Sequence, residues 1–178
     1  MKQLTRILQI LLGVTFLFSA YTKAVGPGFF EITLMDQGLA ANRALAGHMA
    51  RFFIGLEFGL GVLIILPYYA KQLMRFTFVL LGGFTAHLIY LWAIGDTGNC
   101  GCFGEMISMT PEQSIIKNIL MLIVAFVIFK YAKVKTISKS IVLGFMSITI
   151  LSMWFILPMP NHEDFPFETF TKFEPKGR

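Results

Sequence analysis

Two cysteines stand two positions apart in a short glycine-rich stretch that reads DTGNCGCFGE over residues 96–105. A disulfide between Cys100 and Cys102 would close a small ring, because only Gly101 separates the two residues. A ring this small departs from relaxed disulfide geometry, and strain makes a disulfide easier to reduce. Easily reduced, exposed disulfides are the catalytic or regulatory ones. The spacing therefore predicts that Cys100 and Cys102 carry out thiol–disulfide exchange.

Three other interpretations of the cysteine pair remain open. A structural disulfide could staple the loop, although so small a ring removes little entropy from the unfolded chain. The pair could be half of a metal site completed by His162 or an acid, but structural zinc needs four ligands, so we expect no metal. The last alternative is two thiols without a chemical role.

The cysteines lie between long apolar segments. Of the 178 residues, 56% are hydrophobic and 14% are charged, whereas a soluble domain is about half apolar and a quarter charged. Five segments, at about 4–24, 50–69, 73–94, 115–132 and 138–158, approach the ~20 residues that cross a bilayer. The first is longer than the apolar part of a signal peptide, so we interpret it as a span. We expect an all-α polytopic membrane helical bundle.

The charges between the spans predict the orientation of the protein in the membrane. They also account for a net charge of +5 without nucleic-acid binding, which we do not expect. Short cytoplasmic connections collect Lys and Arg. One side of the membrane would hold a basic set without acids, namely Lys2, Arg6, Lys71, Arg75, Lys130, Lys133, Lys135 and Lys139. We therefore expect a cytoplasmic N-terminus, and the location expected for the protein is the inner membrane of a bacterium. Loops 25–49 and 95–114 and the tail 159–178 would be periplasmic.

Both longer outer loops contain helix signals. Residues 26–28 read GPG and break the first span, and apolar residues then alternate with acids over 29–39. This pattern favours a short amphipathic helix at the membrane interface, with an irregular loop as the alternative. Thr110, Pro111 and Gln113 form a capping-box start for the fourth span. Lys117 and Asn118 follow directly, where they could bind carbonyl groups of the cysteine loop.

Ionisable residues inside the spans are the remaining candidates for chemistry, because such residues are costly in lipid. Glu57 and His87 lie at a similar depth, roughly 12–14 Å below the outer edge at 1.5 Å per residue. Lys23 ends the first span and Arg51 begins the second, so either could pair with Glu57 or reach a lipid headgroup. We predict that these four side chains line a cofactor cavity, and a purely structural role for Glu57 and His87 stays open.

The motifs together resemble the MauE/DoxX family of redox-associated membrane proteins. Four patterns match in order over about residues 1–132: FSAYTK at 18–23 followed by Pro27 and Phe29, EFGLG at 57–61, Asp96 with NCGCFG at 99–104, and KNIL at 117–120. The cysteine loop is the most specific of the four. The resemblance implies a four-helix domain over 1–132, to which residues 133–158 add a fifth transmembrane helix and 159–178 an extracytoplasmic tail.

The resemblance also implies a function. MauE-like members are associated with maturation of the disulfide-containing methylamine dehydrogenase, and DoxX relatives with thiosulfate and quinone chemistry. The fifth span and the tail resemble a subgroup that continues into a larger extracytoplasmic domain. Methylamine itself is not indicated by any residue of this chain.

We therefore predict a membrane thiol–disulfide redox protein, in which Cys100 and Cys102 exchange electrons with an extracytoplasmic thioredoxin-like or disulfide-containing protein. Quinone is the expected cofactor, bound near Glu57 and His87. The first alternative is a non-enzymatic membrane anchor or assembly subunit that docks its partner through the tail and the first loop. The second is a small transporter or lipid-binding protein that uses Glu57.

Overall fold

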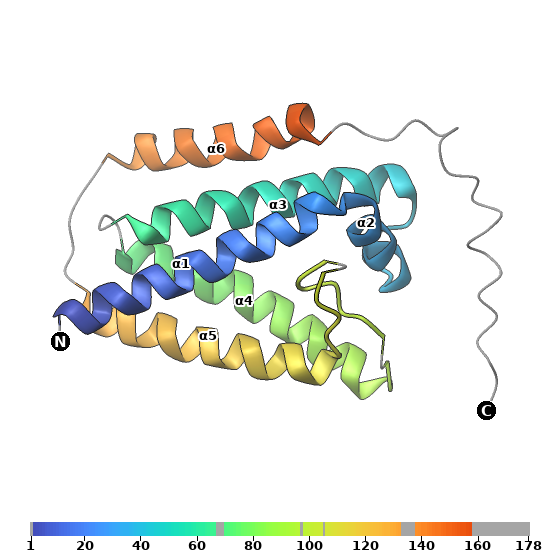
Figure 1. Cartoon of the computed structure of the whole chain (residues 1–178), viewed down its shortest axis with the longest axis horizontal. Coiled ribbons are helices and arrows are strands. Elements are labelled where there is room, and N and C mark those ends of the chain that lie inside the picture. The colour runs from blue at the N-terminus through green and yellow to red at the C-terminus, as the bar shows by residue number, and fades with distance from the viewer. Residues whose placement is uncertain (1, 67–69, 97, 105, 133–137, 158–178) are drawn as a thin grey trace.

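The computed structural model describes residues 2–66, 70–96, 98–104, 106–132 and 138–157 (Figure 1). Its helices are α1 (Lys2–Val25), α2 (Pro27–Asp36), α3 (Arg43–Ile65), α4 (Ala70–Ala93), α5 (Pro111–Tyr131) and α6 (Lys139–Ile156). The described residues contain no strand, which confirms the all-α prediction. The predicted tail 159–178 and the connection 133–137 lie outside the described residues.

Five of the helices, all except α2, are long and apolar enough to cross a membrane. This confirms a multi-pass membrane protein. The second span differs from the prediction at its start, because α3 begins at Arg43 rather than near residue 50. Asn42 caps this helix and accepts a hydrogen bond from the backbone N–H of Leu45 at 2.9 Å. Arg51 therefore lies two turns inside the helix and not at its edge.

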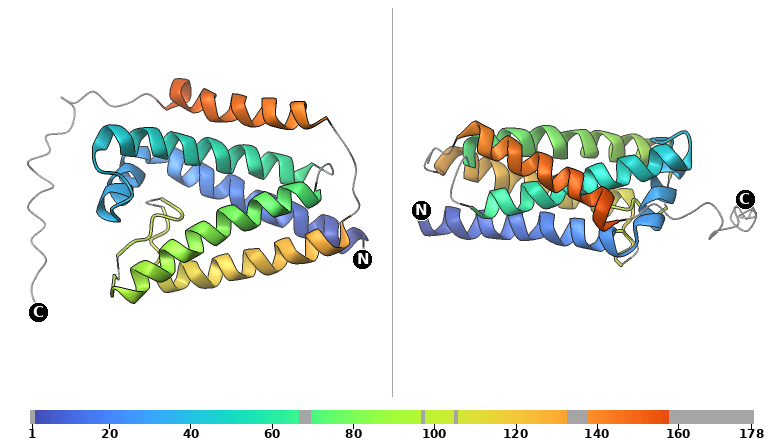
Figure 2. Two further views of the ribbon diagram at one scale, coloured as in Figure 1. Left: turned by 180° about the vertical axis from the view of Figure 1, so that it is seen from behind. Right: turned by 90° about the horizontal axis from the view of Figure 1, so that it is seen from above.

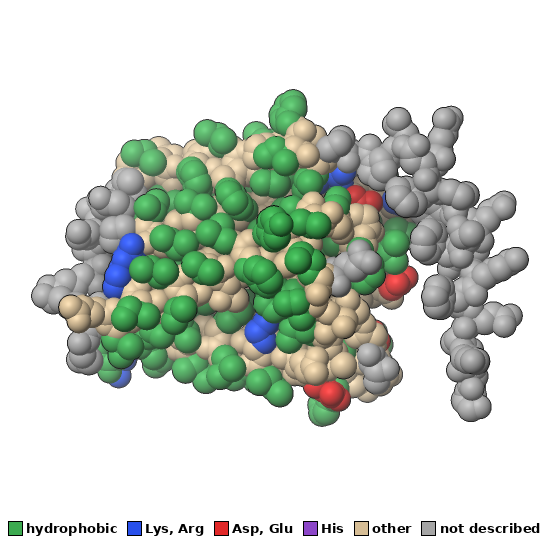
Figure 3. All heavy atoms as spheres, viewed as in Figure 1, with side chains coloured by type: hydrophobic (Ala, Val, Ile, Leu, Met, Phe, Trp, Pro, Cys, Tyr) green, Lys and Arg blue, Asp and Glu red, His purple; other side chains and the backbone are tan. Residues whose placement is uncertain are grey.

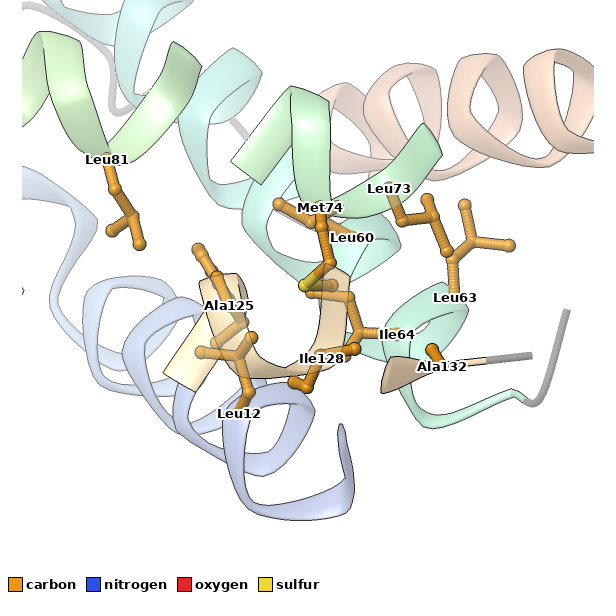
Figure 4. Packing of buried hydrophobic residues seen from close by; sticks show 11 residues of the cluster. Leu12, Leu60, Leu63, Ile64, Leu73, Met74, Leu81, Ala125, Ile128 and Ala132 are labelled. Atoms are coloured by element: carbon orange, nitrogen blue, oxygen red, sulfur yellow. The ribbon is translucent and has the colours of Figure 1, made fainter. Parts of the chain in front are cut away.

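The long helices run alongside one another (Figures 1 and 2). Helix α3 contacts α1 and α6, and α5 contacts α1 and α4. The main hydrophobic core is formed where α1, α3, α4 and α5 meet, in the half of the bundle that contains the N-terminus. Figure 4 shows Leu12, Met74 and Ile128 converging there from three different helices. This core fixes the four helices whose other ends hold the cysteine loop.

Glycines allow two close helix contacts. A Cβ atom on Gly13 would lie 2.8 Å from the carbonyl oxygen of Gly61, so α1 and α3 touch through their backbones. On another face of α3, a Cβ on Gly55 would lie 2.7 Å from the Cα of Ile150, and one on Gly59 would lie 2.6 Å from Thr149 Oγ1. The Gly55-x-x-x-Gly59 pattern therefore packs α6 within the chain, as small residues do between membrane helices.

The short helix predicted after the first span is confirmed as α2. Pro27 occupies its first turn, where a missing N–H costs nothing. The helix packs against α3 and turns Glu31 into the protein, where only 3% of that residue is exposed, while Ile32 faces outward. Phe30 and Leu34 are buried with it, and an ion pair with Arg51 compensates the cost of burying the carboxylate.

The outer surface of the bundle is mainly apolar. Hydrophobic side chains cover the middle of the face shown in Figure 3, and its acidic side chains lie at the end that contains the cysteine loop. The most exposed apolar residues include Val79 at 73% and Phe155 at 88%. Such a belt would be unfavourable in water and is the surface expected of a protein surrounded by lipid.

Candidate functional site

The cysteine loop folds between α4 and α5 at the same end of the bundle as α2 (Figures 1 and 2). Its exit is the predicted capping box, in which Thr110 Oγ1 accepts from the N–H of Gln113 and the Gln113 side chain accepts from the N–H of Thr110. Asn99 organises the interior of the loop: its Oδ1 accepts from the N–H groups of Gly101 and Met109, at 3.1 and 3.3 Å. The loop is therefore held from within and at its end.

Two glycines let the loop enter the bundle. Gly101 and Gly104 have φ angles of +68° and +58°, which side-chain-bearing residues rarely adopt. A Cβ on Gly101 would lie 2.7 Å from Thr33 Cγ2, and one on Gly104 would lie 2.8 Å from the carbonyl oxygen of Thr22. The glycine between the cysteines is thus required both by backbone conformation and by contact with α2.

Lys23 holds the loop against α1 and α3. Its Nζ donates to the Cys102 carbonyl oxygen at 2.8 Å and to Ser19 Oγ at 2.7 Å. It also bonds both Glu57 carboxylate oxygens, at 3.0 and 2.9 Å. Only 3% of Lys23 and 4% of Glu57 is exposed, so this is a buried and well-bonded ion pair. Of the two predicted partners for Glu57, the structure selects Lys23.

Both cysteines are free thiols that hydrogen-bond each other. Cys100 is buried, and its Sγ lies 2.7 Å from Ser114 Oγ, whereas Cys102 is half-buried. The hydrogen bond with Cys100 lowers the pKa of Cys102 to about 6, with help from the charges of Lys117 and Lys23 and against the effect of burial. The same hydrogen bond and burial raise the pKa of Cys100. Of the two thiols, Cys102 is therefore the one that loses its proton more readily.

Gln37, directly after α2, connects the loop to α4. Its Nε2 donates to the Cys100 carbonyl oxygen at 3.2 Å, and its Oε1 lies 3.2 Å from His87 Nε2. Because an amide oxygen only accepts, His87 is the donor in this contact and carries a proton on Nε2. His87 thus touches the cysteine loop through Gln37 and not through Glu57.

Lys117 and Asn118 act differently from the prediction that they bind loop carbonyls. The Lys117 ammonium lies 4.4 Å from the centre of the Phe103 ring, a cation–π contact. Asn118 donates to Thr85 Oγ1 at 3.3 Å and so ties α5 to α4. Ser19, Lys23 and Gln37 take the loop carbonyls instead, because α1 and α2 approach the loop from the other side.

Arg51 lies apart from the cysteines. Its guanidinium bonds Glu31 Oε1 at 3.0 Å, the Gly47 carbonyl at 2.7 Å and the Leu157 carbonyl at 2.6 Å. It is completely buried. We expected Arg51 at the helix edge, facing Glu57 or lipid; the longer α3 and the inward Glu31 place it in a separate cluster between α2, α3 and α6.

One pocket brings the other predicted residues together. Its lining includes Cys100 and Cys102, Lys23, Glu57 and His87, with Phe16, Phe30, Leu81, Phe84 and Leu88 among its apolar walls. Its volume of about 70 Å³ is far below the ~300–1,000 Å³ that encloses a drug-sized ligand. Within the described residues, no three His, Cys, Asp or Glu side chains are placed to hold a metal ion.

Several residues of this site were not singled out in the sequence, among them Asn99, Ser19, Gln37, Thr33 and Ser114. Ser19 was part of a matched motif, and its spacing of four residues from Lys23 places both on one helix face. Gln37 and Ser114 carry no local signal, because their roles come from contacts with segments more than ten residues away.

Five candidate spans form the helical bundle, and a loop with two thiols is folded into one end of it. The chain is therefore of the class of polytopic membrane proteins with a redox-capable site. The family model described as Methylamine utilisation protein MauE matches residues 1–131. The chain therefore belongs to the MauE family, which fits a redox-associated role in the membrane.

The chain is also similar to Protein TlpB of Flavobacterium psychrophilum, with 35% identity over 169 residues. The match covers 89% of this chain and 46% of TlpB, so the chain spans about half the length of that curated relative. No solved structure matches the chain.

Proposed function

We propose that this protein is a membrane thiol–disulfide redox protein whose Cys100 and Cys102 exchange electrons with a thioredoxin-like or other disulfide-containing protein outside the cytoplasm. The observation that carries the proposal is the environment of the pair: two thiols in contact, one of them half-buried and flanked by Lys23 and Lys117. A thiolate is the reactive form of cysteine, and nearby cations favour it.

The orientation is part of the same proposal. The end of the bundle opposite the loop contains Lys71, Arg75 and Lys130, as expected of the cytoplasmic side of an inner membrane. The cysteine loop would then lie on the periplasmic side, where disulfides form and persist. The predicted division into a four-helix domain over 1–132, a fifth helix and a tail also stays a proposal.

The exchange balances as a two-electron step. A partner thiolate attacks one sulfur of the Cys100–Cys102 disulfide, forming a mixed disulfide and expelling the other cysteine as a thiolate that takes up a proton. The second partner thiol, after losing its proton, attacks the mixed disulfide and releases the remaining cysteine. The partner becomes a disulfide, and the protein gains two electrons and two protons. We favour this direction because a disulfide strained by so short a ring is a good oxidant.

A quinone held in the pocket would supply the oxidant that restores the disulfide, since reduction of a quinone to a quinol takes up two electrons and two protons. The pocket suits a quinone headgroup in character, since aromatic and aliphatic walls adjoin N–H donors of Gln37, Lys117 and Asn118. Lys23 and Glu57 would hold the cysteine loop against this pocket, and His87 would hold Gln37.

Two measurements on the full chain in lipid nanodiscs test the proposal. Titration in thiol buffers should show a reversible Cys100–Cys102 couple, and the reduced protein should consume a short-chain quinone analogue at one equivalent per dithiol. The Cys100→Ser/Cys102→Ser double variant should do neither. A double variant that supports the same cellular function as the wild type would overturn the proposal and favour an anchor or assembly subunit.

A further inference from the structure

We propose that the two cysteines have fixed and different roles: Cys102 forms the mixed disulfide with the partner, and Cys100 is the internal sulfur that makes and breaks the bond to Cys102. This inference rests on the proposed function and adds to it an order of events. It assigns the partner-facing role to the second cysteine in the chain, which neither its position nor its spacing would predict.

Residue exposure separates the two cysteines. Cys100 is 6% exposed and packs with Leu88 and Leu91 of α4. Its Sγ also contacts Ser114 Oγ of α5 at 2.7 Å. Cys102 is half-buried. In thiol–disulfide exchange the attacked sulfur is selected by access as well as by leaving-group quality.

Nearby positive charges also distinguish Cys102 from Cys100. Lys23 bonds the carbonyl oxygen of Cys102 at 2.8 Å. Lys117 lies over the ring of Phe103, the residue next to Cys102, at 4.4 Å from its centre. Phe103 is therefore a positioning residue, which holds the Lys117 ammonium where it acts on the Cys102 sulfur. The lowered pKa of Cys102 agrees with this arrangement.

These surroundings suit both halves of the exchange. When a partner thiolate attacks Cys102, the expelled Cys100 sulfur lies beside the Ser114 hydroxyl, which can donate a hydrogen bond to the thiolate as it forms. When the second partner thiol completes the reaction, Cys102 leaves, and a thiol of low pKa is the better leaving group. The surroundings of each sulfur thus favour the step in which that sulfur is the leaving group.

The test compares Cys100→Ser with Cys102→Ser in the full chain. In nanodiscs at pH 7, a membrane-impermeant thiol reagent should modify the thiol of Cys100→Ser at least about tenfold faster than that of Cys102→Ser, since one is a thiolate and the other a buried thiol. In cells, the Cys102 thiolate of Cys100→Ser should attack the disulfide form of the partner, expel one partner thiolate and accumulate as a mixed disulfide that reductant releases, whereas Cys102→Ser should not. Serine keeps a hydroxyl donor at either position.

Lys117→Met tests the positioning contact, and Lys130→Met is its matched control, because Lys130 also lies over an aromatic ring, that of Tyr131, at the other end of α5. In the Cys100→Ser background, Lys117→Met and Phe103→Leu should slow modification of Cys102 at pH 6 by about tenfold. Lys130→Met should leave the rate unchanged.

The results separate the assignment of roles to the two cysteines from the proposed thiol–disulfide exchange itself. Mixed disulfides that accumulate on Cys102→Ser, or equally on both variants, would overturn the assignment while leaving thiol–disulfide exchange intact. Absence of mixed disulfides on both variants, together with wild-type protein that shows no reversible couple, would overturn the proposed function itself.

Discussion

The ammonium of Lys23 lies 2.8 Å from the carbonyl oxygen of Cys102 and also bonds both carboxylate oxygens of Glu57. A residue at the end of the first span thus links the second span to the loop that carries the thiols. The three groups come from positions 23, 57 and 102, so this one side chain fixes where the loop sits on the bundle. Its removal should affect both folding and thiol reactivity, and the two effects can be separated.

Lys23→Met should destabilise the protein by about 3–5 kcal/mol, because it leaves the Glu57 carboxylate buried without a partner. The double variant Lys23→Met/Glu57→Leu should recover most of that loss, since an apolar pair of similar volume tolerates burial. In both variants the alkylation of Cys102 should be slower than in the wild type, because the Lys23 ammonium that bonds the Cys102 carbonyl oxygen is absent. Unfolding in nanodiscs and alkylation rates measure the two effects.

Lys139→Met is the control for this series, because Lys139 is exposed at the start of α6. It should change neither quantity. Normal Cys102 alkylation in Lys23→Met would show that the anchor has no part in thiol reactivity.

The pH dependence of alkylation should reveal one reactive sulfur. The pKa of Cys102 is lowered to about 6, so its thiolate predominates at pH 7 and disappears as pH falls through 6. Below that point the alkylation rate should fall about tenfold per pH unit, as the thiolate fraction does. Cys100, whose pKa is raised, should stay unmodified throughout this range. Mass spectrometry of the alkylated protein assigns the site, and a single midpoint near 8.5 would contradict the arrangement described.

Gly101→Ala should weaken the loop through backbone conformation and contact together. Its φ of +68° costs roughly 1–2 kcal/mol with a side chain present, and the new Cβ would lie 2.7 Å from Thr33 Cγ2. Hydrogen exchange of the loop amides should therefore accelerate. Gly82→Ala is the control, because its Cβ would meet open space within α4. Unchanged protection of the Cys100 N–H, which bonds the Met109 carbonyl at 2.9 Å, would contradict this expectation.

Gly59→Leu should displace α6 without reaching the cysteines. The side chain would enter the space of Thr149 Oγ1, 2.6 Å from the Cβ position. In a Trp92→Phe background, Trp154 is the single tryptophan of the chain, and its indole N–H donates to His48 Nδ1 at 3.0 Å. Its fluorescence should shift when α6 moves, whereas Gly83→Leu, which faces open space, should leave the emission unchanged. An unshifted emission with Gly59→Leu would mean that α6 does not depend on this contact.

Much of the fold could be predicted from local signals. Apolar runs of span length predict the five long helices, and Thr110, Pro111 and Gln113 predict the start of α5 because a capping box is contained within four residues. The Gly55-x-x-x-Gly59 spacing is typical of a close helix contact, but the spacing alone does not identify α6 as the helix that α3 meets.

Less of the site could be predicted from the sequence, because packing determines which residues pair with one another there. Depth along the spans places Glu57 and His87 near one another, and they share a pocket, but depth alone leaves Lys23 and Arg51 equivalent as partners for Glu57. The choice depends on which face of α3 each residue occupies and on α2, which brings Glu31 to Arg51. A carboxylate in a short amphipathic stretch is expected to face outward, and no sequence signal indicated that Glu31 points inward.

The guanidinium of Arg51 bonds Glu31 of α2 and the carbonyl of Leu157, the C-cap residue directly after α6. Two elements that are more than a hundred residues apart thus share a single anchor on α3. If α2 or α6 moves away, the completely buried guanidinium of Arg51 loses a hydrogen-bond partner. The cost of that buried charge then lowers the stability of the helix that remains in place. Helices α2 and α6 should consequently open as one cooperative unit, with the stability of α2 set in part by α6.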